Sequence, residues 1–317
     1  MSNIFAHMIW AAKPGNPALL ASSWQPTVSP VTNNLTSVTY GNGVYVASGN
    51  TTGSAGVIIT SANGINWVQR TPATATLLNG ILFDGTRFIS YGTDICTSPD
   101  GKTWTLVTAG INVTGLTYGG GLYVCCSTSG YGGYTLYGSV LSSLTYSPSI
   151  LLTFGCPLAL CYGNGQFWGV TGGWSTNVYA CVIYSTNGYT WYNNYNTGAG
   201  NYASYLWGIA YGSGVRIYCG TESGTYATLF DKNNNQIVMS PDYRNKVNNI
   251  SLKFINGKFI AVYASSNFTP YYTNILQSSN GSTWTQTYLA NYIYLDVACS
   301  TTEYVMVGKG GITCVSI

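Results

Sequence analysis

One tight-turn pattern occurs four times in this chain and constrains the fold more than any other feature. In each copy a Ser ends an apolar segment, Asn-Gly or Asp-Gly follows, and a Trp opens the next segment. Because Asn, Asp and Gly tolerate positive φ, the pattern predicts a hairpin turn between two short strands. The structural turn residues expected from it are Ser61, Asn63 and Trp67, then Ser98, Asp100 and Trp104, then Ser185, Asn187 and Trp191, then Ser278, Asn280 and Trp284.

A second marker gives the period of the repeat. It places an aromatic residue, a Gly-rich turn and an apolar pair together, as in Tyr40-Gly41-Asn42-Gly43-Val44-Tyr45, and a degenerate seventh copy begins at Cys299. Successive markers lie roughly 35 to 49 residues apart, which suits one four-stranded propeller blade per repeat. The sequence therefore predicts an all-β chain that forms a seven-bladed β-propeller, with little helix.

The two ends of the chain complement each other. The last repeat offers only three strands, near 296–299, 304–307 and 312–315, whereas 19–30 resembles the last strand of a repeat. We expect an N-terminal strand to complete the last blade, because closure removes open sheet edges. The predicted domain is 19–317, with blades at about 35–76, 77–114, 115–159, 160–206, 207–249, 250–295, and 296–317 plus 19–30.

Two blades lack the full turn pattern. In blades three and five we assign degenerate turns to 146–149 and 239–242, which keep the Ser and lose the Trp.

Composition limits the kinds of partner. Only 6% of the 317 residues are charged, the formal net charge is +3 and no Lys/Arg cluster occurs, so a nucleic-acid partner is not expected. No apolar run reaches the ~18 residues of a membrane helix, so membrane insertion is not expected. The nine cysteines show no CxxC spacing and lie mostly in strand-like segments, which favours buried, reduced thiols over disulfides or a metal set.

The repeated turn resembles the Asp-box of sialidase-like propellers, in a form one residue tighter. The blade opening Tyr-Gly-Asn-Gly-Val-Tyr-Val-Ala resembles repeats of bacteriophage tail and virion proteins and of bacterial surface propellers. This resemblance covers 19–317 and implies the propeller fold. It implies a function only weakly, because one fold hosts many functions.

Sialidase chemistry is not expected from these residues. The resemblance would require an arginine triad, but Arg70, Arg87, Arg216 and Arg244 do not recur at the starts of inner strands. The single His7 precedes the ring, so no His triad or His-rich metal site is predicted within it. No cofactor is predicted. A carboxylate pair such as Asp94 and Glu222 leaves a polysaccharide-acting glycosidase as the least favoured alternative.

The loops between strands two and three, and those between blades, lie on one face of a propeller, and here they are rich in aromatic residues. Tyr and Trp among Ser, Gly and Asn make a recognition surface of low ordering cost. An alternative is that many of these rings only pack between blades. The ligand-binding residues expected on this loop-rich face are Tyr131, Tyr134, Trp174, Tyr202, Tyr205, Trp207, Tyr271, Tyr272 and Tyr292.

These features together favour a non-enzymatic bacteriophage virion protein, a tail or adsorption component that folds in the host cytoplasm and recognises a host glycan or protein. Residues 1–18, which precede the repeats, are either a docking peptide for other virion proteins or a tail packed on its own domain. The main alternative is a secreted or cell-surface carbohydrate-binding propeller.

Overall fold

The computed structural model describes residues 24–52, 55–129, 132–147, 157–172, 180–194, 203–222, 226–231, 233, 235–239, 250–265 and 272–316. The side chains of 128–129, 132–133, 157, 203–205, 221–222, 226–227, 237–239 and 265 lie outside the description. The proposed N-terminal peptide 1–18 also lies outside the described residues.

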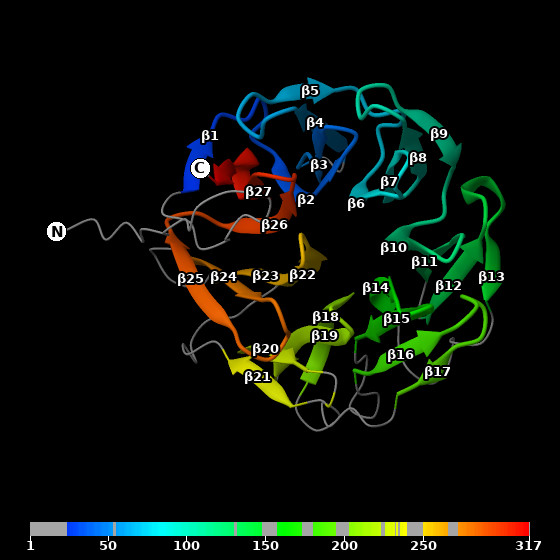
Figure 1. Ribbon diagram of the computed structural model, residues 1–317. Coiled ribbons are helices and arrows are strands. Elements are labelled where there is room, and N and C mark those ends of the chain that lie inside the picture. Colours follow the sequence, from blue (N-terminus) through cyan, green and yellow to red (C-terminus); the bar gives the residue numbers. More distant parts are fainter. Residues whose placement is uncertain are drawn as a thin grey trace.

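The described chain forms seven four-stranded antiparallel sheets arranged as the blades of a ring (Figure 1). This confirms the predicted seven-bladed β-propeller. Blades one to three are β2 (Asn34–Gly41), β3 (Val44–Asn50), β4 (Gly56–Ser61) and β5 (Val68–Arg70); β6 (Leu78–Phe83), β7 (Phe88–Gly92), β8 (Ile95–Ser98) and β9 (Thr105–Thr108); and β10 (Val113–Gly119), β11 (Leu122–Ser129), β12 (Gly132–Gly138) and β13 (Thr145–Ser147).

The remaining blades follow in the same order of strands. They are β14 (Pro157–Gly163), β15 (Gln166–Thr171), β16 (Val182–Ser185) and β17 (Tyr192–Asn193); β18 (Ala203–Gly212), β19 (Val215–Glu222), β20 (Tyr226–Phe230) and β21 (Gln236–Met239); β22 (Ile250–Ile255), β23 (Lys258–Ser265), β24 (Tyr272–Ser278) and β25 (Thr285–Ala290); and β26 (Tyr294–Cys299), β27 (Tyr304–Gly308), β28 (Thr313–Ser316) and β1 (Trp24–Thr27). Within the described residues, two single-turn 3-10 helices lie between strands: η1 (Leu141–Ser143) and η4 (Lys309–Gly311).

The seventh blade closes the ring as the sequence predicts. Strand β1 pairs antiparallel with β28, in a register that places Trp24 opposite Ser316 and Thr27 opposite Thr313. The blue β1 accordingly lies beside the red C-terminal strands in Figure 1. The two threonine hydroxyl oxygens lie 2.6 Å apart, so a side-chain hydrogen bond accompanies the backbone pairing. Because β1 pairs with β28, the C-terminal strand is not left as an open outer edge, and blade seven has four strands like the other blades.

The four repeated turns share one hydrogen-bond arrangement. In each, Oδ1 of the Asn or Asp accepts from the backbone N–H groups two and three residues later, at 2.8–3.0 Å. It also accepts from the Ser hydroxyl at 3.0–3.1 Å. The Trp indole N–H donates to the Gly carbonyl at 3.0–3.3 Å. The polar groups of the turn are thus satisfied locally.

The Gly of the repeated turn packs against the preceding blade. A Cβ built on Gly101, whose φ is +73°, would lie 2.7 Å from Val46 Cγ2 of the blade before it. The same relation joins Gly64 to Val305, Gly188 to Val124 and Gly281 to Ile217. Glycine is therefore required both for the left-handed backbone and for the close approach of two blades.

The degenerate turns assigned to blades three and five are wrong. In blade three, 145–147 forms β13, and the turn before it contains η1, whose Leu141 is buried in a cluster that joins blades two and three. In blade five, Gln236–Met239 forms β21, and Asp231 makes the preceding turn by accepting from the N–H groups of Asn233 and Asn235. The sequence resembles the Ser of the repeated turn there, but Ser147 and Met239 lie on the fourth strand of their blades, whereas the Ser of the repeated turn ends the third.

The core lies between blades rather than inside one sheet. One cluster, for example, joins Leu35 and Val38 of the first blade to Val305 and Val307 of the seventh. Eight cysteines in the described part of the chain carry free thiols, and adjacent Cys125 and Cys126 are both fully buried. Both faces of a blade are covered by neighbours, so successive residues of a strand can both be buried.

Candidate functional site

The loop-rich face is only partly within the described residues. Tyr131, Trp174, Tyr202 and Tyr271 lie outside them, as does the side chain of Tyr205. The predictions made for these five residues therefore stay predictions.

The four other predicted ligand-binding residues are spread over three blades. Tyr134 of blade three packs against Tyr146, with ring centroids 5.2 Å apart, and Trp207 of blade five packs against the core. Tyr272 and Tyr292 both lie in or beside blade six, and Tyr292 is 38% exposed. The structure brings only these last two to the same blade.

Tyrosine accounts for every large aromatic side chain exposed in the described part of the chain. These residues are Tyr118, Tyr146, Tyr189, Tyr192, Tyr288 and Tyr292. Three of them lie on outermost strands: Tyr146 on β13, Tyr192 on β17 and Tyr288 on β25. We call Tyr146, Tyr189, Tyr192, Tyr288 and Tyr292 the rim tyrosines. The predicted set included Tyr292 and omitted the other four. Tyr146, Tyr192 and Tyr288 belong to outer strands and Tyr189 to a repeated turn, rather than to the variable loops.

Blade four carries an aromatic ladder that ends at a rim tyrosine. Trp168, Tyr184 and Tyr192 lie side by side on three neighbouring strands, with successive ring centroids 5.5 Å apart. The guanidinium carbon of Arg216, from blade five, lies 4.5 Å from the centre of the Trp168 ring, a cation–π contact. Burial lowers the pKa of this Arg216 guanidinium.

The inner end of this ladder, Trp168, stands at a strand position where the other blades have smaller side chains. At the Trp168 position the aligned strands carry only Val or Ile: Val46, Ile89, Val124, Ile217, Ile260 and Val305. Blade five has no repeated turn to pack against this position, and the large Trp168 and Arg216 fill the space. The deep part of the ladder is therefore structural, and its exposed end, Tyr192, is available at the surface.

The inner strands enclose a central channel of about 610 Å³. Apolar and hydroxyl-bearing side chains line it, together with the amide of Asn79 and one ion pair, in which Lys253 Nζ lies 2.7 Å from Asp296 Oδ2. The same ammonium donates to the carbonyls of Val38 and Val297, and Asp296 accepts from the N–H of Val38. Because these residues belong to blades six, seven and one, this ion pair links three blades at the point of ring closure.

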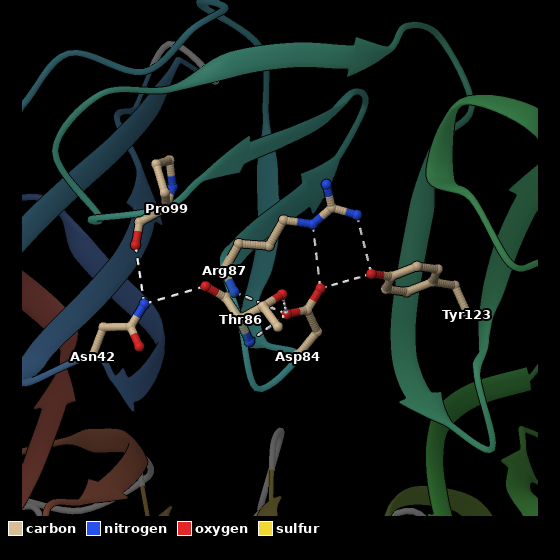
Figure 2. Close-up of polar contacts among 6 residues, drawn as sticks. All are labelled: Asn42, Asp84, Thr86, Arg87, Pro99 and Tyr123. Carbon is tan, nitrogen blue, oxygen red and sulfur yellow. Dashed lines mark hydrogen bonds and ion pairs between the residues drawn. The ribbon is translucent and has the colours of Figure 1, made fainter.

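A second charged cluster lies on the turn face, which carries the turns between strands one and two and between strands three and four. In Figure 2 the Arg87 side chain extends from the first turn of blade two toward Tyr123 of blade three. Arg87 Nε donates to Asp84 Oδ2 at 3.3 Å and Arg87 Nη2 donates to the Tyr123 hydroxyl at 3.1 Å. The Tyr123 hydroxyl donates to Asp84 Oδ2 at 2.6 Å.

Asp84 is the centre of this cluster. Its Oδ1 accepts from the N–H and hydroxyl of Thr86 and from the N–H of Arg87, at 2.7–2.9 Å. Burial by itself would raise the pKa of this carboxyl group, but the hydrogen bonds from Tyr123, Thr86 and Arg87 outweigh it and lower the pKa to about 2. Asp84 is therefore ionised at neutral pH. The Asn42 side chain donates to the carbonyls of Thr86 and Pro99 and so holds this turn against blade one (Figure 2).

Asp84 also changes the packing of the next blade. At its position four blades have glycine, and the next blade's aromatic ring lies on that glycine, 2.1–2.3 Å from where a Cβ would be. These pairs are Gly41 with Phe83, Gly119 with Tyr162, Gly163 with Tyr211 and Gly212 with Phe254. Asp84 leaves no such space, and the corresponding ring, Tyr118, is 38% exposed.

The described residues contain no group of three or more His, Cys, Asp or Glu side chains able to hold a metal ion. Nor does that part of the chain contain a helix long and apolar enough to cross a membrane.

Comparison with known proteins shows the fold alone. No family model and no curated protein matches this chain. Among solved structures, virginiamycin B lyase from Staphylococcus aureus has a TM-score of 0.69 at 8% identity, covering 93% of this chain and 99% of the lyase. The computationally designed protein Ika8 gives 0.57 at 9% identity, covering 92% of this chain and 100% of Ika8. Sqt1 from Saccharomyces cerevisiae gives 0.52 at 11% identity, covering 92% of this chain and 99% of Sqt1.

Proposed function

We propose that this propeller is a non-enzymatic recognition subunit of a bacteriophage virion, a tail or adsorption component that binds glycans on the host surface. The observation that carries the proposal is the set of rim tyrosines in a chain with only 6% charged residues. A Tyr ring offers a flat apolar face to a sugar ring, its hydroxyl group remains available for hydrogen bonding, and few torsions are lost on binding.

Five of the six carboxylates whose side chains are described support a binding role rather than hydrolysis. Asp84, Asp100 and Asp231 accept hydrogen bonds from the N–H groups of their own turns. Asp94 accepts from Gly110 N–H and Asp296 from Lys253. Each of these five groups is thus held in a structural contact, whereas a glycosidase needs a pair of carboxyl groups facing its substrate. A release of reducing ends from bacterial polysaccharides would favour the glycosidase alternative.

The binding part of the proposal is tested with labelled protein on a panel of bacterial cells and their extracted surface glycans. We compare the wild type with Tyr288→Ala/Tyr292→Ala and with Tyr189→Ala/Tyr192→Ala. The matched control is Leu106→Ala, which removes a side chain of similar exposure from an outer strand. We expect selective binding that at least one tyrosine pair reduces about tenfold or more, a loss of about 1.4 kcal/mol of binding free energy.

The virion part of the proposal has a separate test. Mass spectrometry of purified phage particles should detect this chain in a fixed ratio to the tail proteins. Its absence from particles, together with tyrosine-dependent glycan binding, would favour the free carbohydrate-binding propeller. A folded protein that binds no cell or glycan would contradict the recognition role.

A further inference from the structure

We propose that the turn face holds a separate site for the carboxylate of an acidic sugar, formed by Arg87, Tyr118 and Tyr123. We call these three residues the Arg87 site. None of them is a rim tyrosine, so this inference stands or falls independently of the glycan binding proposed above.

The guanidinium of Arg87 is fixed at the surface. Asp84 holds Nε and Tyr123 holds Nη2, at 3.3 and 3.1 Å, while the Arg87 side chain remains 40% exposed. Within the described residues, Nη1 has no hydrogen-bond partner, and Figure 2 shows it pointing away from Asp84 and Tyr123. The outer edge of the guanidinium, made of one N–H of Nη1 and the second N–H of Nη2, thus presents two parallel donors in fixed positions, the arrangement that binds a carboxylate in bidentate fashion.

The negative charge of Asp84 faces the other way. Its side chain is only 3% exposed, and both of its oxygens accept hydrogen bonds from the turn, from Arg87 and from Tyr123. An incoming anion therefore meets the outer edge of the guanidinium and not the carboxylate. Because the ion pair is neutral overall, we expect weak binding, on the order of a millimolar dissociation constant.

The fold does not require this charged cluster. Four junctions between blades are packed at the same level by an uncharged aromatic ring on a glycine. At the Arg87 position the other first turns carry Val44, Leu122, Gln166, Val215, Lys258 and Glu303, none of which has a planar donor pair with a positive charge. Blade two thus departs from the repeat at two positions, Asp84 and Arg87, and these two side chains contact each other.

The exposed ring of Tyr118 favours a sugar over a small inorganic anion. Its centroid lies 4.5 Å from that of Tyr123, whose hydroxyl contacts the Arg87 guanidinium. A carboxylate on the guanidinium would thus place an attached pyranose ring near an open aromatic face. The apolar C–H groups of a uronic acid can then pack on Tyr118 while the acid group remains on Arg87.

The test is calorimetric titration with trigalacturonate at low salt, beside its fully methyl-esterified form, which keeps the rings and removes the charge. The variants are Arg87→Gln and Tyr118→Ala. The control Lys102→Gln removes one exposed positive charge from the repeated turn of the same blade. Sodium acetate is added as a competitor to separate sugar recognition from carboxylate binding alone.

We expect the acid form to bind at least tenfold more tightly than the ester. Arg87→Gln should remove this difference, Tyr118→Ala should weaken binding about threefold or more, and Lys102→Gln should change it less than twofold. Equal binding of acid and ester, or unchanged binding by Arg87→Gln, would overturn the site. Acetate that binds as tightly as trigalacturonate, as judged from the competition, would overturn the sugar assignment. If Arg87→Gln fails to fold, the Tyr118→Ala titration decides the question.

Discussion

Replacing Gly101 by Ala tests whether the repeated turn joins neighbouring blades. The new Cβ would lie 2.7 Å from Val46 Cγ2, about 1 Å closer than an ordinary carbon contact. An L residue at φ +73° costs roughly 1–2 kcal/mol, and overpacking a closely packed site costs roughly 1–3 kcal/mol more. We expect Gly101→Ala to lower the free energy of unfolding by about 2–5 kcal/mol.

Gly43→Ala is the matched control. Gly43 has a φ of +78°, and nothing lies within 4 Å of its Cβ position, so only the backbone cost of about 1–2 kcal/mol applies. Unfolding in urea, followed by tryptophan fluorescence and circular dichroism together, measures both variants and shows whether the transition is two-state.

A double-mutant cycle isolates the contact between blades. Val46→Ala removes the atom that the new Cβ would strike. If the close approach is the cause, Gly101→Ala/Val46→Ala should cost at least about 1 kcal/mol less than the sum of the two single changes. Additive costs, or a Gly101→Ala variant no less stable than Gly43→Ala, would refute the view that this turn packs two blades together.

Three further predictions concern closure, acid stability and the thiols. Lys253→Met should lower the free energy of unfolding, measured in urea, by about 2–3 kcal/mol, because it leaves the 5% exposed Asp296 side chain without its cation. The control Lys258→Met, in the same blade, should have a smaller effect. Equal effects would contradict a role of the Lys253–Asp296 ion pair in ring closure. Asp84 has a folded-state pKa of about 2 against an ordinary 3.8, so its contribution to the free energy of unfolding is present above about pH 4 and is lost as the pH falls toward 2. Asp84→Asn should remove about 1 kcal/mol of this acid-dependent stability after solvent screening. An unchanged dependence of stability on pH would contradict the hydrogen bonds assigned to Asp84. Burial raises the pKa values of the Cys125, Cys181 and Cys314 thiols, so the native protein should react slowly with a thiol reagent at pH 8 and rapidly once unfolded, whereas rapid native reaction would contradict their burial.

Local sequence was sufficient for the fold. The turn around Asn63 and Gly64 is determined by residues within five positions of each other, since the Asn side chain satisfies the N–H groups beside it and Gly accepts positive φ. Seven markers at one period then fix the number of blades, and the missing fourth strand of the last repeat predicts the pairing of β1 with β28. Where the pattern is degenerate, as at 146–149, the sequence predicts a turn in the wrong place, because a Ser-Pro pair does not indicate which strand of the blade it follows.

The candidate sites depended on contacts between blades, which no local pattern encodes. Arg87 was one of four scattered arginines in the sequence; only the ring places it against Tyr123, 36 residues later, and only the loss of the glycine at position 84 leaves Tyr118 exposed. Likewise Lys253 and Asp296 form hydrogen bonds with the backbone of Val38, more than 200 residues away in the sequence, because ring closure makes the first and last blades neighbours. The sequence by itself determined the repeat, its turns and its ring. The tertiary structure decided which side chains meet across blades, because those distances are set by the packing of whole sheets.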